Sequence, residues 1–391
     1  MKFNKWTLGL AAVGVVSLTS AARADETNMV MTALSATSIS GYVDVSAQYN
    51  PGGGGGVNNS PNYNFGNQAN QFSLNVVDIA LDKPLDEAPW ASGYHVELWL
   101  GPDGSALGTS TSGGSAAIRS AYIALRTPVG NGIDWKFGVF DTIIGYEGLT
   151  SGNNPNFSRS YGFNIEPTTH TGGLATYKIN DIVTMQAGLA DTSFAGGYTA
   201  AINGAPANGN GNSSLSTPTI LLASTLTAPD SWGWAKGGVL SYGIINTSGG
   251  SANGATSHYV GFTLPTPVAA LKFGGSFDYL NVHSGGNTWN VAGYSTYAFN
   301  DKLSLNLRAE HLSGSTFLNA GAYFNTTAAG SNASDEITAT LQYNLWANVL
   351  SRVEVRWDHV EHGNGYASTS STGIGTESEA WLLAAQLIYT F

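Results

Sequence analysis

The last residues of the chain, 380–391, read AWLLAAQLIYTF and follow a two-residue rhythm. Successive side chains of an extended strand point to opposite faces. One face of this segment is therefore apolar and mostly bulky, and it carries Trp381, Leu383, Ala385, Leu387, Tyr389 and Phe391. The other face mixes small, polar and aliphatic residues, namely Ala380, Leu382, Ala384, Gln386, Ile388 and Thr390. A segment of about ten residues with one such apolar face is the repeating unit of a transmembrane β-barrel.

The same alternation recurs along the chain and predicts an all-β protein, a transmembrane antiparallel β-barrel of sixteen strands. We expect the strands at 38–49, 71–82, 92–100, 116–127, 132–140, 172–179, 182–190, 218–228, 235–246, 257–265, 268–281, 288–299, 302–312, 335–346, 349–360 and 380–391. The apolar phase of the second strand switches between Val76 and Val77, which predicts a β-bulge there.

The connections between these strands alternate in length. Long stretches rich in Gly, Asn and Ser follow the odd strands, at 50–70, 101–115, 141–171, 191–217, 313–334 and 361–379. Tight turns follow the even strands, such as Asn180-Asp181, Asn300-Asp301 and Ala347-Asn348. Bacterial outer-membrane barrels have short periplasmic turns and long extracellular loops. An even number of strands therefore places the N-terminus and the C-terminus of the chain on the same, periplasmic side.

The composition agrees with a barrel and excludes other classes. Charged residues make up 10% of the 391 residues, against roughly 25% in soluble domains, yet the mean hydropathy is close to zero. The absence of Cys excludes disulfides and thiol chemistry. The formal net charge of −11 argues against a nucleic-acid partner. A soluble β-sandwich or β-helix also has regular strands. Aromatic residues at the strand ends favour the barrel instead, because they suit a membrane interface: Trp289, Phe299, Trp346, Trp357, Trp381 and Phe391.

The first residues, 1–24, have the pattern of a cleaved signal peptide. Lys2 and Lys5 precede an apolar stretch at 8–18, and Ala22-Arg23-Ala24 supplies a cleavage site before Asp25. Cleavage takes the formal net charge from −11 to −14, because the leader holds three basic residues and no acid. We expect a short N-terminal segment at 25–37 and the barrel at 38–391.

Three stretches resemble the OmpL-like β-barrel porin-2 (BBP2) family. They are Ser73-Leu74-Asn75 leading into ALDKP at 80–84, FGVFDTIIGYE at 137–147, and FSRSYGFNIEPTTHTG at 157–172. The family carries Gly-Lys-Phe where this chain has Gly138-Val139-Phe140, so any role of that lysine does not transfer. The resemblance implies an outer-membrane porin whose terminal Phe391 is read by the barrel assembly machinery. Because sixteen-stranded porins form homotrimers, the resemblance also implies a homotrimer.

A barrel of sixteen strands is wide enough for an aqueous channel, and the face predicted to line it carries many charges. The wall residues that we single out are Asp44, Asp134, Arg308, Glu310, Arg352, Glu354 and Arg356. We expect them to be hydrated, since burial of unpaired charges is costly. The excess of acids predicts a mild cation preference.

The connection at 141–171 is the longest and carries Glu147, Arg159 and Glu166. By the resemblance to porins, this loop folds into the lumen, and its three charges form a pore constriction that faces Arg308, Arg352 and Arg356. The simpler interpretation is that they are solvated loop charges.

We therefore expect a passive channel for small hydrophilic solutes or ions, surrounded by lipid in the outer membrane of a Gram-negative-type bacterium. A sugar-specific channel guided by aromatic residues such as Tyr42 and Trp99 is one alternative. A plugged barrel that acts as an enzyme or adhesin is another. We expect no catalytic residues and no cofactor. We also expect no metal site, because His359 and His362 lie on alternate faces of a strand end.

Overall fold

The computed structural model describes residues 37–51, 70–107, 116–191, 218–247, 254–283, 286–315, 331–362 and 378–391. The predicted signal peptide at 1–24, and all of the following segment except Thr37, lie outside the described residues. So do most residues of the predicted long loops, with the exception of the connection at 141–171. No helix among the described residues is long and apolar enough to cross a membrane.

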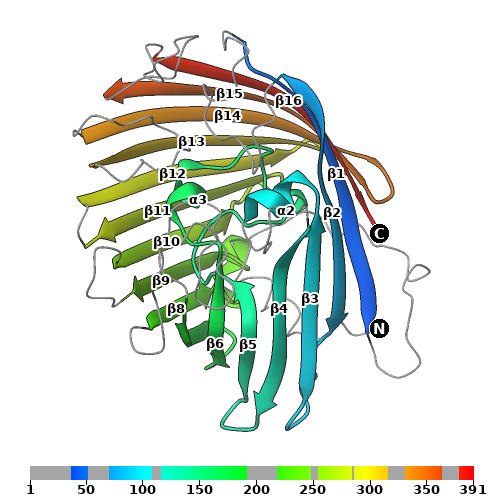
Figure 1. Cartoon of the computed structure of the whole chain (residues 1–391), viewed down its shortest axis with the longest axis vertical. Coiled ribbons are helices and arrows are strands. Elements are labelled where there is room, and N and C mark those ends of the chain that lie inside the picture. The colour runs from blue at the N-terminus through cyan, green and yellow to red at the C-terminus, as the bar shows by residue number, and fades with distance from the viewer. Residues whose placement is uncertain are drawn as a thin grey trace.

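Sixteen antiparallel strands form one closed barrel, in which each strand pairs with its neighbours in sequence and β1 pairs with β16 (Figure 1). The strands are β1 Ser38–Tyr49, β2 Gln71–Lys83, β3 Ser92–Leu100, β4 Ala116–Thr127, β5 Ile133–Asp141, β6 Thr169–Lys178, β7 Val183–Ala190, β8 Thr219–Thr227, β9 Val239–Thr247, β10 Ala255–Pro265, β11 Leu271–Val282, β12 Gly286–Ala298, β13 Leu303–Ser315, β14 Ser331–Trp346, β15 Val349–His362 and β16 Glu379–Thr390. The predicted fold class and strand number are confirmed.

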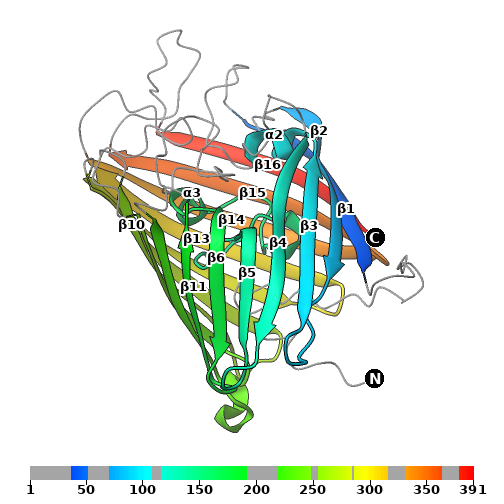
Figure 2. The ribbon, with the colours of Figure 1, turned by 60° about the horizontal axis from the view of Figure 1, so that its bottom comes forward.

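Short helices occupy some of the connections. They are α2 Pro102–Leu107, the 3₁₀ turns η2 Ser151–Asn153 and η3 Asp230–Ala235, and α3 Tyr161–Ile165. The turn η3 accounts for one shifted boundary. We predicted the ninth strand from residue 235, and β9 begins at Val239 because the preceding residues wind into η3 and a turn. Figure 2 shows the tilted strands of the barrel, with η3 (light green) below the lower ends of the green strands.

A β-bulge interrupts β2, one residue before the predicted position. Asp44 pairs with Val76 and Val45 pairs with Leu74, so Asn75 is the extra residue. Asn75 and Val76 are both buried, and Asn75 donates to Asp44 Oδ1 at 2.9 Å. A bulge places two consecutive side chains on nearly the same side of a sheet, which explains the switch of phase in the sequence. A second bulge lies at Arg119 on β4, because Glu97 pairs with Ser120 and Leu98 with Ile118.

The two faces of the barrel differ as the alternation predicts. Leu341 on β14 lies between Leu305 on β13 and Val353 on β15, and these side chains point outward. Their sequence neighbours, such as Thr340 and Glu354, point inward and are buried. Several outward aromatic residues lie near the two ends of the strands, including Trp346 at the turn into β15 and the paired Trp357 and Trp381.

An arginine on the outer face should cost most at the middle of the apolar band. Leu341 lies about midway between Trp346 and the level of Trp357, which pairs with Ile337. We expect Leu341→Arg to lower the free energy of unfolding by about 2–4 kcal/mol, and Phe299→Arg in the girdle by about 0–1 kcal/mol. The measurement is denaturant unfolding of the barrel in phospholipid vesicles. Equal effects at both positions would contradict a lipid-facing outer surface.

Candidate functional site: a segment folded inside the barrel

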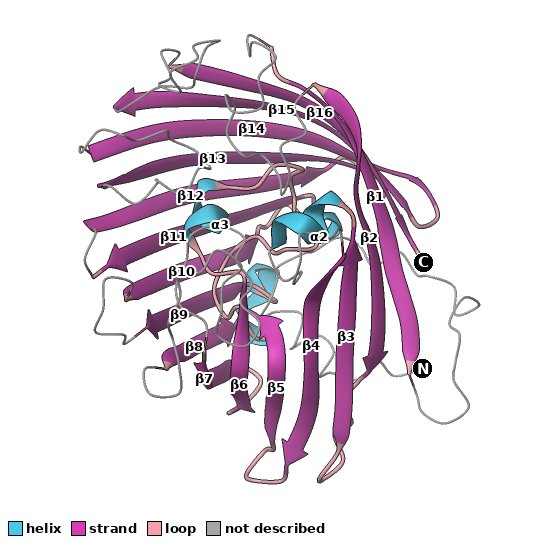
Figure 3. Ribbon diagram, in the orientation of Figure 1, coloured by secondary structure: helices cyan, strands magenta, loops and turns pink. Residues whose placement is uncertain are grey.

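Residues 142–168, which we call the inner segment, connect β5 to β6 and lie within the ring of strands (Figure 3). Its side chains Phe157, Tyr161 and Ile165 are buried against inward-facing residues of the wall. The predicted connection extended to residue 171. In the structure β6 already begins at Thr169.

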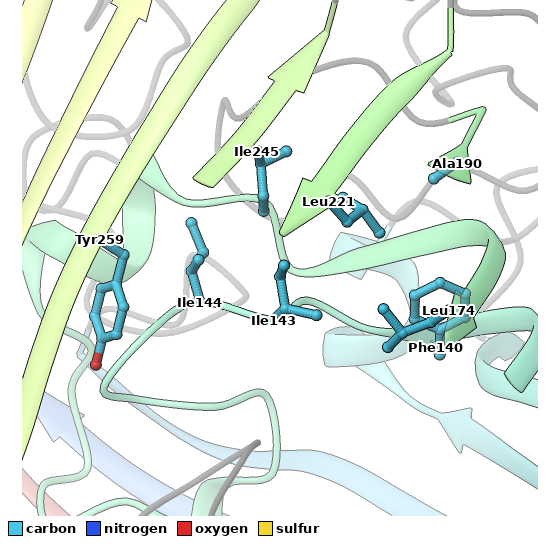
Figure 4. Packing of buried hydrophobic residues seen from close by; sticks show 8 residues of the cluster. All are labelled: Phe140, Ile143, Ile144, Leu174, Ala190, Leu221, Ile245 and Tyr259. Atoms are coloured by element: carbon cyan, nitrogen blue, oxygen red, sulfur yellow. The ribbon is translucent and has the colours of Figure 1, made fainter. Parts of the chain in front are cut away.

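Apolar contacts hold the beginning of the inner segment against one side of the barrel. Ile143 and Ile144 pack on Leu221, Ile245 and Tyr259, which belong to β8, β9 and β10 (Figure 4). Burial of each such side chain stabilises by about 1.5–3 kcal/mol relative to exposure. The side chains come from distant parts of the sequence, so only closure of the barrel brings them together.

Later residues of the inner segment contact the remaining wall. Leu149 and Phe163 pack with Trp99 of β3 and with other residues of β1, β2, β4 and β16. Tyr161 and Ile165 pack with Leu280 on β11 and with inward residues of β10, β13 and β15. The inner segment therefore touches the barrel around much of its circumference.

Arg308 of β13 is the most extensively bonded side chain beneath the inner segment, and it is fully buried. Its Nη1 lies 2.7 Å from Glu147 Oε1 and also donates to the carbonyl oxygen of Ser158 at 2.7 Å. Its Nε donates to Glu336 Oε2 on β14 at 2.9 Å. A planar guanidinium with five N–H donors suits such a site. Arg308 thus links the wall to the inner segment through both a charge and a backbone group.

Two more wall arginines bind backbone carbonyls of the inner segment. Arg356 Nη1 donates to the carbonyl oxygen of Arg159 at 2.6 Å, while Nη2 pairs with Asp358 at 2.6 Å. Arg352 Nη1 donates to the carbonyl oxygen of Ser151 at 3.0 Å, and its Nη2 contacts the Asn154 carbonyl.

Two wall carboxylates accept hydrogen bonds from backbone N–H groups of the same segment. Glu354 accepts from Phe157 N at 2.6 Å and from Ser158 N at 3.0 Å. Glu310 accepts from Tyr161 N at 2.8 Å. Buried backbone groups need partners, and irregular backbone at membrane depth occurs only where protein or a water-filled cavity supplies them. Here charged side chains of the wall supply them.

The structure brings some predicted site residues together and separates others. Glu147 lies beside Arg308, as expected. The Arg159 side chain does not face the wall arginines. It donates to the Leu149 carbonyl at 2.8 Å and lies over the Phe163 ring, while its own carbonyl meets Arg356.

Glu166 departs from the prediction, since its carboxyl faces Asp278 of β11 instead of an arginine. Burial and the negative charge of Asp278 raise the pKa of Glu166 well above its ordinary value. A protonated Glu166 can donate to Asp278, so the two acids coexist without a cation between them. Gly145, at φ +111°, passes so close that a Cβ there would lie 2.5 Å from Glu166 Oε2. The absence of a side chain at residue 145 makes room for the acid.

The predicted hydrated lining is wrong for most of the wall charges. Asp44, Arg308, Glu310, Arg352, Glu354 and Arg356 are all buried, because the inner segment and neighbouring side chains cover them. Asp44 binds Gln386 and Asn75. Asp134 stands apart on β5, 2.6 Å from Arg126.

A second charged cluster on the inner wall stays partly exposed. His95 on β3 lies 3.1 Å from Asp82 on β2, and their side chains are 18% and 37% exposed. Asp141 at the end of β5 is 44% exposed and lies 2.5 Å from Arg119. Lys136 lies nearby, over the ring of Tyr122. We did not single out Arg119 from the sequence, because its bulge breaks the alternation that identifies inward residues.

Closed antiparallel barrels that are apolar outside and polar inside are the membrane-spanning barrels of bacterial outer membranes, and this protein has the sixteen-stranded, porin-like form of that fold. More narrowly, the chain belongs to the family described as "Putative beta-barrel porin-2, OmpL-like", whose sequence profile matches residues 36–391. A search of curated proteins found no match.

Several solved structures share the fold at low sequence identity. The outer membrane channel DcaP of Acinetobacter baumannii is 14% identical, with a TM-score of 0.60 over 91% of this chain and 97% of that one. The anion-selective porin from Comamonas acidovorans is 11% identical, with a TM-score of 0.56 over 91% and 99%. The trimer form of OmpT, an outer membrane protein of Vibrio cholerae, is 12% identical, with a TM-score of 0.55 over 91% and 99%.

The raised pKa of Glu166 makes the stability of the inner segment depend on pH. A carboxyl whose pKa is higher in the folded than in the unfolded protein contributes most stability below its unfolded pKa, and that contribution falls as the pH rises toward the folded pKa. We expect Glu166→Gln, which stays neutral, to lose less unfolding free energy than the wild type between mildly acidic and mildly alkaline pH. Denaturant unfolding across this range is the measurement.

The matched control is Glu87→Gln, an exposed acid in the turn before β3. It should keep the pH dependence of the wild type. If Glu166→Gln also kept that dependence, Glu166 would titrate normally and the proposed acid pair would not exist.

Proposed function

We propose that this protein is a passive channel for small hydrophilic solutes or ions in the outer membrane of a Gram-negative-type bacterium. The inner segment narrows the lumen, and solutes pass beside Asp82, His95 and Asp141 on β2, β3 and β5, whose side chains stay partly exposed. The observation that carries this proposal is the contrast in exposure between the two charged clusters. Arg308 and its partners are fully buried, whereas Asp82, His95 and Asp141 stay partly open.

The charged side chains along β2–β5 bear on which ions the channel is expected to prefer. Asp82 and Asp141 face Lys136 and His95 there, and the whole chain carries a formal net charge of −11. Charged groups at a constriction bias which ions enter. We infer a mild preference for cations, which a reversal potential in a salt gradient would measure.

The alternative functions find less support among the described residues. Tyr42 and Trp99, which a sugar track would need at the surface of the route, are buried in an apolar cluster. An enzyme needs a nucleophile beside a base. The carboxylate of Glu147, which could serve as such a base, is bound by Arg308 and accepts a hydrogen bond from Ser160 N instead. The loop tips that an adhesin would use lie mostly outside the described residues.

Two features bear on how the protein assembles into a trimer and into the membrane. The trimer form of OmpT shares this fold, which supports a homotrimer for this protein. Phe391 is partly exposed, and its backbone pairs with Gly41 of β1. We propose that this exposed terminal aromatic ring is the group that the barrel assembly machinery reads.

Thiol labelling of single-cysteine variants in planar bilayers tests both the channel and its route, because the chain contains no Cys. We expect stepwise conductance from the folded wild type. A negatively charged, membrane-impermeant thiol reagent should reduce the conductance of Lys136→Cys, because residue 136 lines the route. The same reagent should leave Thr340→Cys unchanged, because the inner segment covers Thr340 through Asn156.

The wild type treated with the reagent serves as the unreactive control. A folded barrel without stepwise conductance would contradict the channel. Block of Thr340→Cys without block of Lys136→Cys would contradict the route.

A further inference from the structure

Three potential metal ligands meet on the outer face of the barrel, away from the inner segment. They are His311 on β13, Asp335 on β14 and Glu361 on β15, and one ligand atom of each lies within 4.8 Å of the others. Their sequence neighbours Glu310, Glu336 and Val360 point inward and are buried. The three ligands therefore belong to a separate site.

Strand register brings these residues together. His311 lies directly opposite Asp335, and the distance from His311 Nδ1 to Asp335 Oδ1 is 2.8 Å. Glu361 is the extra residue of a bulge in β15, because Ser334 pairs with Val360 and Ala333 with His362. A bulge redirects a side chain relative to the regular ladder, and here Glu361 joins the pair formed by its two neighbouring strands.

The surroundings place this site at the level of the aromatic girdle. The ring of His311 lies 5.3 Å from that of Trp289, between centroids. Trp357 lies on β15, the same strand as Glu361, and is close to Trp381 on the neighbouring β16. Tryptophan collects where the bilayer meets water. The three ligands are thus near the membrane interface and partly exposed, so a dissolved ion can reach them.

We propose that His311, Asp335 and Glu361 bind a divalent transition-metal cation of the zinc type. One imidazole nitrogen and two carboxylate oxygens form a mixed set of the kind that Zn²⁺ accepts, and three protein ligands leave a fourth position for water. Tetrahedral ligand bonds of about 2.0–2.2 Å place the donors about 3.3–3.6 Å apart, so His311 Nδ1 and Asp335 Oδ1, now 2.8 Å apart, must separate slightly while Glu361 adjusts its position. The exposed, flexible Glu361 side chain can make that movement. A metal-bound site would tie three adjacent strands together near their long connections.

The alternative is that His311 and Asp335 form a hydrogen-bonded pair and Glu361 lies nearby as a solvated acid. The two interpretations differ in what zinc does. A metal site stabilises the folded barrel by an amount that rises with the zinc concentration relative to Kd, and its affinity falls at acidic pH because metal ligands must be deprotonated. A simple pair responds to zinc in neither way.

The test is calorimetric titration of Zn²⁺ into the folded full-length barrel in detergent after treatment with a chelator. We expect saturable binding of one ion per chain, a rise in the unfolding midpoint with zinc, and weaker binding at acidic pH. His311→Ala, Asp335→Asn and Glu361→Gln should each weaken binding by at least about tenfold, since even indirect partners of a metal site contribute about that much.

The matched control is His283→Ala, an exposed histidine that contacts Thr256 in another part of the barrel. It should bind zinc as the wild type does. Zinc-free unfolding midpoints establish that each variant is folded, and the three variants report independently of one another. Absence of saturable binding to the wild type, or full affinity in all three variants, would overturn the proposal. Binding abolished only by His359→Ala or His362→Ala would overturn it as well. The channel proposal stands or falls separately on conductance.

Discussion

The arrangement inside the barrel depends on the contacts that the buried Arg308 guanidinium makes. It binds a carboxylate of the inner segment, a backbone carbonyl of the same segment and a carboxylate of the neighbouring strand. Transfer of these charges from water is costly, and the loss of one partner from a buried pair destabilises by about 3–5 kcal/mol. The network is therefore stable only while the inner segment stays in place. In turn, the inner segment stays because its backbone finds partners there.

This mutual dependence gives the barrel two unlike sides. On β13–β16 the charged side chains form hydrogen bonds with the backbone of the inner segment and hold it in place. On β2–β5 several charges are buried as well, among them Asp78, Glu97 and Arg119, but Asp82, His95 and Asp141 stay partly exposed. The inner segment thus determines which of the inward charges stay exposed inside the barrel.

Much of the fold could be predicted from the sequence, and the reasons are physical. Alternate residues of each strand must face lipid and lumen, and segments such as 335–346 and 380–391 show this alternation in their sequence. The prediction lost precision where the alternation breaks. We predicted the bulge in β2 one residue away from its actual position at Asn75, and the bulge at Arg119 kept that arginine from being recognised as an inward residue.

The candidate site was harder to predict, because burial depends on what covers a residue. Alternation identified Arg308 and Arg356 as inward, but it could not indicate that backbone from the inner segment would exclude water from them. Contacts across strands were also missed. His359 and His362 were weighed for metal binding because they are close in sequence, whereas His311 and Asp335 meet only through strand register.

The most direct test of this account is the single-channel conductance of Glu147→Gln compared with that of the wild type in planar bilayers. This substitution removes the negative charge that Arg308 binds and leaves the side-chain volume nearly unchanged. If the buried pair holds the inner segment in place, the variant should conduct more than the wild type and fluctuate between levels, while its barrel remains folded. An unchanged, steady conductance in a folded variant would contradict the account.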